Sequence, residues 1–167
     1  MKNEKIIISG PPGSGKTSII NELKALKYHC FPEISPPNLD LNELKNKIKL
    51  SEYIFEKRID QYYSQNIELS FYDRSLVDVV AYMNYWRIEY PNKWNEQINH
   101  LQYSKKVFYT PSWEQIYVQS KVRQETFKEA TQIDNFLRKA YHHYNYKIIE
   151  VPRKKIEDRV NFIINKL

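Results

Sequence analysis

The chain has 167 residues, of which 41% are hydrophobic and 28% charged, an ordinary balance for one globular domain, residues 1–167, with a packed core. Its single cysteine excludes an internal disulfide framework, and we find neither a signal peptide nor an apolar run of the roughly 18 residues that a membrane span needs, so we expect a cytoplasmic protein. The net charge of +6 admits nucleic acid or another anionic ligand, although the lysines are scattered along the chain.

Hydrophobic periodicity predicts strands and helices that alternate along the first half of the chain. Residues 4–9 (EKIIIS) are typical of a short buried strand, and apolar residues at helical spacing follow it. A proline-rich segment, 32–40, then interrupts the pattern as a loop. The expected elements here are a strand at 4–9, a helix at 16–26, a strand at 27–31 and a long helix from Leu41 to Tyr62.

The same alternation continues to the end of the chain. We expect a strand that ends on charge at Asp73, helices at 76–90 and 92–103, a strand at 107–109, mostly helix over 112–144, a strand at 146–152 and a closing helix from Ile156. Five strands separated by helices favour an α/β fold, with a parallel sheet covered on both faces. Ligands bind at the carboxyl ends of the strands in such sheets, so residues that directly follow strands are candidate site residues.

All three glycines of the chain lie between positions 10 and 15. The stretch GPPGSGKT has the spacing G-x-x-x-x-G-K-T and lies between a predicted strand and a predicted helix, as a phosphate-binding loop requires. Its amides would form an anion nest at the helix N-terminus, with Lys16 adding a full positive charge. We therefore expect the triphosphate of ATP to contact the loop residues Gly10, Pro11, Pro12, Gly13, Ser14, Gly15, Lys16, Thr17 and Ser18.

A magnesium ion would complete the triphosphate site. Thr17 offers a hydroxyl oxygen, and Asp73, at the end of an apolar strand, offers a carboxylate opposite it. The alternative is that Asp73 serves as the N-cap of the helix that begins after Ser75. We favour the metal role, because a loop that binds a triphosphate demands a cation partner.

Several blocks of the sequence resemble one known group of proteins. They are IIISGPPGSGKTSIINELKALKYHCFPEIS, FYDRSLVDVVAYM, FYTPSWEQIYV, VRQETFKEA and YKIIEVPRKKIEDRVNFIINKL, in chain order. Together they resemble the small bacterial AAA-type predicted ATPases, a group similar to ribosylnicotinamide kinases and other P-loop nucleoside and nucleotide kinases. The resemblance implies a three-layer P-loop NTPase fold, a five-stranded parallel sheet in kinase-like order, a lid at about 112–127, and the use of ATP with Mg²⁺.

The resemblance also implies roles for residues outside the loop. An acid at the position of Glu33 deprotonates the acceptor hydroxyl in similar nucleoside kinases, with Asp73 as the alternative base. Arg74 would bind phosphate or the acceptor, the alternative being a surface arginine. In the lid, Arg123 would close over the γ-phosphate, a role that Lys121 could share, or would be only a solvated helix residue. The turn of Pro152 and Arg153 would cradle the adenine against the lid.

Three functions fit these features. We favour a small-molecule kinase that transfers the γ-phosphoryl group of ATP to a nucleoside- or nucleotide-like acceptor, with ribosylnicotinamide as the named example. A polynucleotide 5′-hydroxyl kinase would use the net charge of +6 and the dense aromatic run AYMNYWRIEYPNKW. An ATPase-type nucleotide switch would instead act through a protein partner that the lid meets only when nucleotide is bound.

Overall fold

The computed structural model describes residues 4–35, 37–101, 103–119 and 125–167. Within them, five strands form one sheet in the order β2-β3-β1-β4-β5, and each pair of neighbouring strands is parallel. The strands are β1 (Glu4–Ser9), β2 (His29–Phe31), β3 (Leu69–Asp73), β4 (Lys106–Tyr109) and β5 (Lys147–Glu150). The helices are α1 (Lys16–Ala25), α2 (Leu44–Ser64), α3 (Leu76–Tyr85), α4 (Asn92–His100), α5 (Phe127–His143) and α6 (Ile156–Ile164), with the 3₁₀ turn η1 (Glu114–Ile116). The α/β fold expected from the sequence is confirmed.

The register of the sheet brings the strand-end residues to one edge. β1 lies in the centre, where Ile8 pairs with Asp73 of β3 and Ser9 pairs with Tyr109 of β4. Because all strands run in the same direction, the segments that follow β1, β2, β3 and β5 emerge from this same edge. The glycine loop, Glu33, Arg74 and Arg153 therefore follow strands at this one edge of the sheet.

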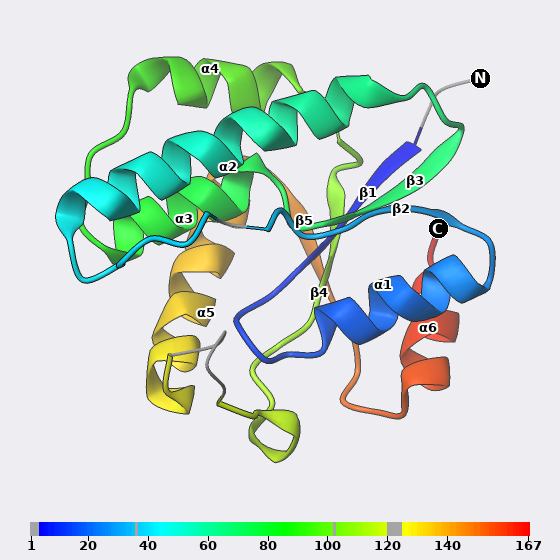
Figure 1. Ribbon diagram of the computed structural model, residues 1–167. Helices are drawn as coiled ribbons and strands as arrows, with labels where there is room; N and C mark the ends of the chain where they lie inside the picture. The colour runs from blue at the N-terminus through cyan, green and yellow to red at the C-terminus, as the bar shows by residue number, and fades with distance from the viewer. Residues whose placement is uncertain (1–3, 36, 102, 120–124) are drawn as a thin grey trace.

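Two apolar cores cover the two faces of the sheet. Ile6 and Ile8 of β1 are buried in the core that α1 and α6 complete, whereas Ile7 faces the larger core under α2 to α5. Figure 1 shows α1 and α6 on one side of the sheet and α2 to α5 on the other. The alternation follows from the pleat, because successive side chains of a strand point to opposite faces. Among the described residues, every helix is too short or too polar to cross a bilayer.

Helix α3 ends five residues before the bound expected from the sequence. Trp86 closes it, and the amide of Ile88 donates to the carbonyl of Met83 at 2.9 Å while that of Arg87 donates to Asn84 at 3.1 Å. This is a Schellman motif, and it requires Arg87 to adopt a left-handed φ of 58°. The apolar residues after Trp86 continue the helical spacing but belong to a loop that packs on the core.

The expectation of mostly helix over 112–144 is wrong for its first part. Among the described residues of 112–126, only Glu114–Ile116 form a short 3₁₀ turn, and α5 begins at Phe127. The start is set by a capping box, in which the Thr126 hydroxyl accepts from the amide of Glu129 and the Glu129 carboxylate accepts from the amide of Thr126. Hence the segment before α5 is a connection that passes the glycine loop.

Candidate functional site

The glycine loop connects β1 to the N-terminus of α1 and is organised around Lys16. The Lys16 ammonium donates to the carbonyl oxygens of Gly10 and Pro11, at 2.8 and 2.7 Å, so that the side chain folds back over the loop. Lys16 is 5% exposed. Burial, together with the charge of the Arg74 guanidinium, lowers the pKa of Lys16 to about 7. A bound polyphosphate would supply the negative charge that this ammonium lacks among its present partners.

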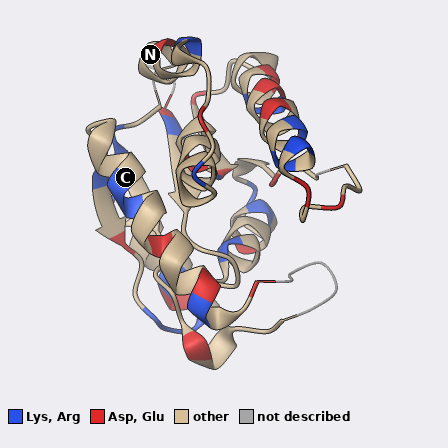
Figure 2. Ribbon diagram, turned by 90° about the vertical axis from the view of Figure 1, so that its left-hand side faces the viewer, with Lys and Arg blue, Asp and Glu red and all other residues tan. Residues whose placement is uncertain are grey.

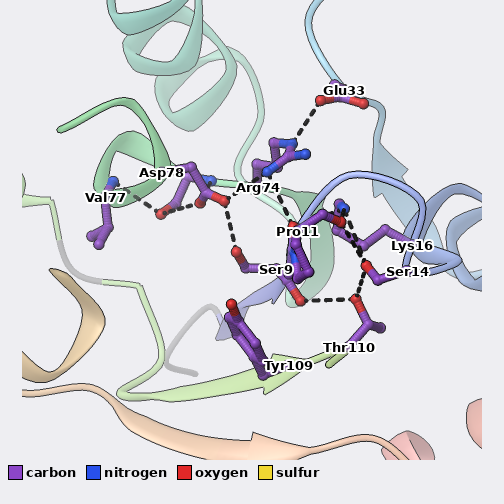
Figure 3. A network of polar contacts seen from close by, with 12 residues as sticks. Ser9, Pro11, Ser14, Lys16, Glu33, Arg74, Val77, Asp78, Tyr109 and Thr110 are labelled. Atoms are coloured by element: carbon purple, nitrogen blue, oxygen red, sulfur yellow. Dashed lines mark hydrogen bonds and ion pairs between the residues drawn. The ribbon is translucent and has the colours of Figure 1, made fainter. Parts of the chain in front are cut away.

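The glycines of the loop sit where other groups approach closely. A Cβ built on Gly10 would lie 2.2 Å from the carbonyl oxygen of Thr110, which follows β4. The Thr110 hydroxyl in turn bonds the Ser14 hydroxyl at 2.6 Å, and this ties the loop to the neighbouring strand (Figure 3). Thr17 and Ser18 are exposed, and the first turn of α1 holds no acidic residue. The loop therefore presents free amides and hydroxyls at a helix N-terminus, an arrangement that binds phosphate.

The carboxylate of Asp73 lies buried at the end of β3. It is 1% exposed, and its Oδ1 atom has no hydrogen-bond partner among the described residues. Burial raises the pKa of Asp73, while the nearby Lys16 ammonium acts in the opposite direction. Ser75, not Asp73, caps α3, so the alternative role of Asp73 as N-cap is excluded. An unpaired carboxylate oxygen and the exposed Thr17 hydroxyl are hard oxygen ligands of the kind that Mg²⁺ prefers.

Arg74 links the glycine loop to Glu33. Its Nε donates to a Glu33 carboxylate oxygen at 2.6 Å, and its Nη1 donates to the Gly10 carbonyl oxygen and to Asp78, both at 3.2 Å (Figure 3). Arg74 is 8% exposed, so it is not the surface arginine that the sequence left open. The ion pair thus joins Glu33 and Arg74, 41 positions apart in the sequence, next to the loop.

The ion pair sets the protonation state of Glu33. Burial by itself would raise the pKa of Glu33, but the charges of Arg74 and Lys16 and the hydrogen bond from Arg74 outweigh it and lower the pKa to about 2. The Glu33 side chain nevertheless keeps 49% of its surface exposed. Glu33 is therefore an ionised carboxylate at neutral pH with a face open to a ligand.

The Asp78 carboxylate accepts hydrogen bonds that fix the position of Arg74. Its Oδ2 accepts from the amide of Ser75 at 2.8 Å, which closes the capping box of α3, and from the Tyr141 hydroxyl at 2.6 Å. Its Oδ1 accepts from Ser9 at 2.6 Å as well as from Arg74. With every one of these bonds made inside the protein, Asp78 acts as a structural anchor that fixes the direction of Arg74.

A single cavity of about 1040 Å³ runs from the glycine loop to the helices on the opposite side. The cavity is lined by Gly15, Thr17 and Ser18 together with the β5–α6 turn. It is also lined by Glu33 and Arg74 and by apolar side chains of α2 and α3 and of the β2–α2 loop. These are Ile34, Leu50, Ile54, Val79, Tyr82 and Trp86. This volume lies at the upper end of the roughly 300–1,000 Å³ that is usual for small-ligand sites.

The remaining predicted site residues have different fates. Arg153 lines the cavity and donates to the carbonyl oxygen of Ser112, at 3.1 Å from Nε and 2.8 Å from Nη2. Pro152 precedes it at the end of β5 and is not among the residues that line the cavity. Arg123, like Lys121, lies outside the described residues. The structure therefore brings together the loop, Glu33, Asp73, Arg74 and Arg153.

Two buried arginines lie at the cavity: Arg159, which sequence reasoning missed, and Arg58, which it treats as a weaker candidate, more often a helix-surface residue. Arg58 of α2 is 1% exposed and donates to the carbonyl oxygen of Arg74 at 3.2 Å. Arg159 of α6 is 4% exposed and donates to the carbonyl oxygen of Ser14 at 2.9 Å. Each lies at helical spacing from buried residues of its own helix, Phe55 for one and Ile163 for the other. The sequence signal that could have identified both as site residues is a cation on the apolar face of an amphipathic helix.

Comparisons with solved structures agree with this architecture. A deoxyadenosine kinase from M. mycoides with bound dCTP superposes with a TM-score of 0.67, at 19% identity, over 97% of this chain and 97% of that one. A thymidylate kinase from Ehrlichia chaffeensis gives 0.65, at 11% identity, over 99% of both chains. The YorR protein from Bacillus subtilis, in complex with phosphorylated GDP, gives 0.63, at 16% identity, over 97% of this chain and 94% of that one. At these identities the likeness shows the fold.

The family comparison covers most of the sequence. A search of curated proteins finds no match. The profile of the AAA domain family matches residues 5–159, which include the glycine loop and all of the five described strands except the first residue of β1. The chain therefore belongs to the AAA domain family and has the fold seen in nucleoside and nucleotide kinases.

Proposed function

We propose that the protein is an ATP- and Mg²⁺-dependent kinase that phosphorylates a hydroxyl group of a nucleoside-like small molecule in the cytoplasm. One observation carries the proposal: the phosphate-binding loop and the Glu33–Arg74 pair line the same cavity. A carboxylate that shares a cavity with a triphosphate site is placed to meet the nucleophile of a phosphoryl transfer. Neighbours in fold include kinases of nucleosides and of nucleotides.

The charges beside Glu33 favour a hydroxyl over a phosphate as nucleophile. The Nε and Nη1 of Arg74 already bond Glu33, Asp78 and the Gly10 carbonyl oxygen. An acceptor phosphate would face the ionised Glu33 carboxylate and be repelled by it. A neutral hydroxyl can donate to Glu33 without that repulsion. We therefore place nucleosides before nucleoside monophosphates as acceptors.

The chain's own residues would then divide the reaction between them. The loop amides and Lys16 hold the β- and γ-phosphates, Thr17 and Asp73 hold Mg²⁺, and the metal neutralises charge on the phosphate oxygens. Glu33 accepts the proton of the acceptor hydroxyl while the hydroxyl oxygen forms a bond to the γ-phosphorus. At the same time the bond from that phosphorus to the leaving ADP oxygen breaks. A base with a pKa of about 2 is weak, but a loose transition state demands little proton removal before bond formation.

The distribution of charge favours a small acceptor over a polynucleotide. In the view of Figure 2, Lys and Arg are interspersed with Asp and Glu along the helices, and no helix there is wholly basic. A groove for a nucleic-acid backbone would gather positive charge in one stripe. The cavity walls beside Glu33 are instead mostly aliphatic and aromatic.

A panel assay tests the proposal. Ribosylnicotinamide, common nucleosides, their monophosphates and a 5′-hydroxyl oligonucleotide are each offered with MgATP, and products are identified by mass. We expect phosphorylation of a nucleoside-like compound, with a loss of turnover on the order of 10²–10³ in Lys16→Ala while that variant keeps its fold by circular dichroism. Transfer only to the oligonucleotide, or hydrolysis with no acceptor phosphorylated, would overturn it.

A further inference from the structure

Arg159 reaches the glycine loop from the opposite end of the chain. It lies on α6, 145 positions from Ser14, whose carbonyl oxygen accepts from its Nη2 at 2.9 Å. Val160 and Ile163 pack in the same core as Ile19, Ile20 and Leu23 of α1, and this contact holds α6 beside the start of α1. The position of the guanidinium is therefore set by the packing of two helices.

The Arg159 guanidinium occupies the space that a side chain at position 15 would need. A Cβ built on Gly15 would lie 2.5 Å from Arg159 Nη1, and the residue adopts a left-handed φ of 86°. On its other side the Arg159 guanidinium lies 5.6 Å from the centre of the Trp113 ring, within reach of a cation–π interaction. The Nε atom of Arg159 is buried and has no hydrogen-bond partner in the described parts of the chain. Burying a charged group that is only partly hydrogen-bonded costs free energy of folding. Such a group is therefore a candidate for a functional role.

The geometry of the peptide bond between Ser14 and Gly15 indicates that task. The bond is planar and trans, so the Ser14 carbonyl oxygen and the Gly15 amide hydrogen point in opposite directions. A charged donor that holds the oxygen on one side therefore aims the amide hydrogen at the other side. The same hydrogen bond polarises the peptide and makes the amide a stronger donor.

We propose that Arg159 is a positioning residue of the phosphate site: it orients the Ser14–Gly15 peptide so that the Gly15 amide donates to a bound polyphosphate. This inference rests on the proposed function, because it assigns a partner to that amide. Trp113 and Ile116, in the segment that follows β4, cover the guanidinium and the adjacent Gly15. The orientation of the loop thus depends on α6, which the glycine motif itself does not include.

The glycine content of the chain makes the test direct. The protein has three glycines, Gly10, Gly13 and Gly15, and all lie in the loop. Labelling with ¹⁵N-glycine therefore yields three amide resonances that report on the loop alone. We expect the Gly15 resonance to move in ligand-free Arg159→Met, since its peptide is released, and to move less in Arg159→Lys, which keeps a charged donor.

Calorimetry with MgATP measures the consequence. Loss of a charged hydrogen bond that orders the site should weaken the affinity of Arg159→Met by ten- to a hundredfold, about what such a bond contributes, with Arg159→Lys between the variant and the wild type. Arg87→Met is the control, because it removes an exposed arginine that does not line the cavity, and its affinity should match the wild type.

The outcomes separate this inference from the proposed function. An affinity of Arg159→Met within twofold of the wild type overturns the positioning role. So does an unchanged Gly15 resonance in the ligand-free variant, even if affinity falls, because Arg159 would then contact the nucleotide directly. Failure of the wild type itself to bind MgATP contradicts the proposed function, while the ligand-free Gly15 resonance still tests the link to Arg159. Should Arg159→Met not fold, Arg159→Lys carries both measurements.

Discussion

At the scale of single residues, Arg74 combines strain with connectivity. It adopts a left-handed φ of 74°, a conformation that costs a residue with a side chain roughly 1–2 kcal/mol. The Arg74 amide donates to the Ile8 carbonyl oxygen at 2.9 Å, and the Arg58 side chain donates to the Arg74 carbonyl oxygen at 3.2 Å. The surrounding bonds therefore hold a conformation that the isolated chain would avoid, as is common at functional sites. The result is a guanidinium aimed at both the loop and Glu33.

Replacing Glu33 with Gln tests the acceptor side of the site. The amide keeps the shape but cannot take the proton of the acceptor, so kcat should fall by about 10²-fold, at the lower end for general-base catalysis, with a smaller effect on the KM for ATP. In the wild type, a pKa of about 2 keeps Glu33 ionised from pH 5 upward, so its titration should give no acidic limb in that range. A kcat within threefold of the wild type would contradict the role.

At the scale of elements, three helices end without glycine where glycine is the usual choice. Each closes with a residue in the left-handed conformation, followed by an amide that donates back to the last turn. The residues are Lys27 after α1, Arg87 after α3 and Asn145 after α5. All glycines lie in the loop, so residues with side chains adopt the strained left-handed backbone conformation at these three helix ends.

Arg87→Gly should therefore stabilise the protein. Relief of left-handed strain favours the folded state, the added freedom of glycine in the unfolded chain partly offsets it, and we expect a net gain of roughly 0.5–1 kcal/mol in the free energy of unfolding. Urea denaturation measures it. Arg87→Ala is the matched control, since it removes the same side chain but keeps the strain, and it should show no gain. Equal stabilities of the two variants would show that the side chain, not the backbone, is responsible.

Asp134 of α5 ties the connection after β4 to the helix layer. It accepts from Tyr109 at 2.8 Å, from the Ser112 hydroxyl at 2.7 Å and from Arg138 at 2.7 Å, and Arg138 also pairs with Glu150 of β5 at 2.6 Å. Burial alone would raise the pKa of Asp134, but these hydrogen bonds outweigh it and hold the pKa below its ordinary value. One carboxylate thus fixes where the chain leaves the sheet and passes the cavity.

Asp134→Asn should lower stability and change its pH dependence. A depressed folded pKa contributes stability that is present above the unfolded pKa of about 3.9 and is lost as the pH falls through the folded value. We expect the variant to be less stable by about 1–3 kcal/mol at pH 7 and to lose less stability than the wild type between pH 5 and 3. Denaturation at several pH values measures both. Parallel acid limbs for the two proteins would contradict the assignment.

At the scale of the whole molecule, the cavity joins parts that no single element supplies. The loop follows β1, Glu33 follows β2, Arg74 follows β3, and the β5–α6 turn lines the same cavity. The two cores on either side of the sheet hold these segments in place from both faces. A ligand bound there stabilises the packed state of all of them at once.

MgATP should accordingly raise the melting temperature. Binding only to the folded state stabilises it by about 2.7 kcal/mol at a free ligand concentration of 100 times Kd, and the shift should grow with the logarithm of concentration. Differential scanning fluorimetry measures it, with EDTA and Lys16→Ala each expected to remove most of the effect. A shift that persists at full size in Lys16→Ala would show that the nucleotide binds away from the loop.

The local features of this protein can be read from its sequence: the glycine loop with Lys16 and Thr17, the alternation of strands and helices, and the polar residues that follow strands. Such features depend on neighbours a few positions apart, which periodicity and spacing report. The pairing of Arg74 with Glu33 and of Arg159 with Ser14, 41 and 145 positions apart, is seen only in the folded chain. These contacts arise from the order of the strands and the packing of α6 on α1, and local spacing carries no record of either.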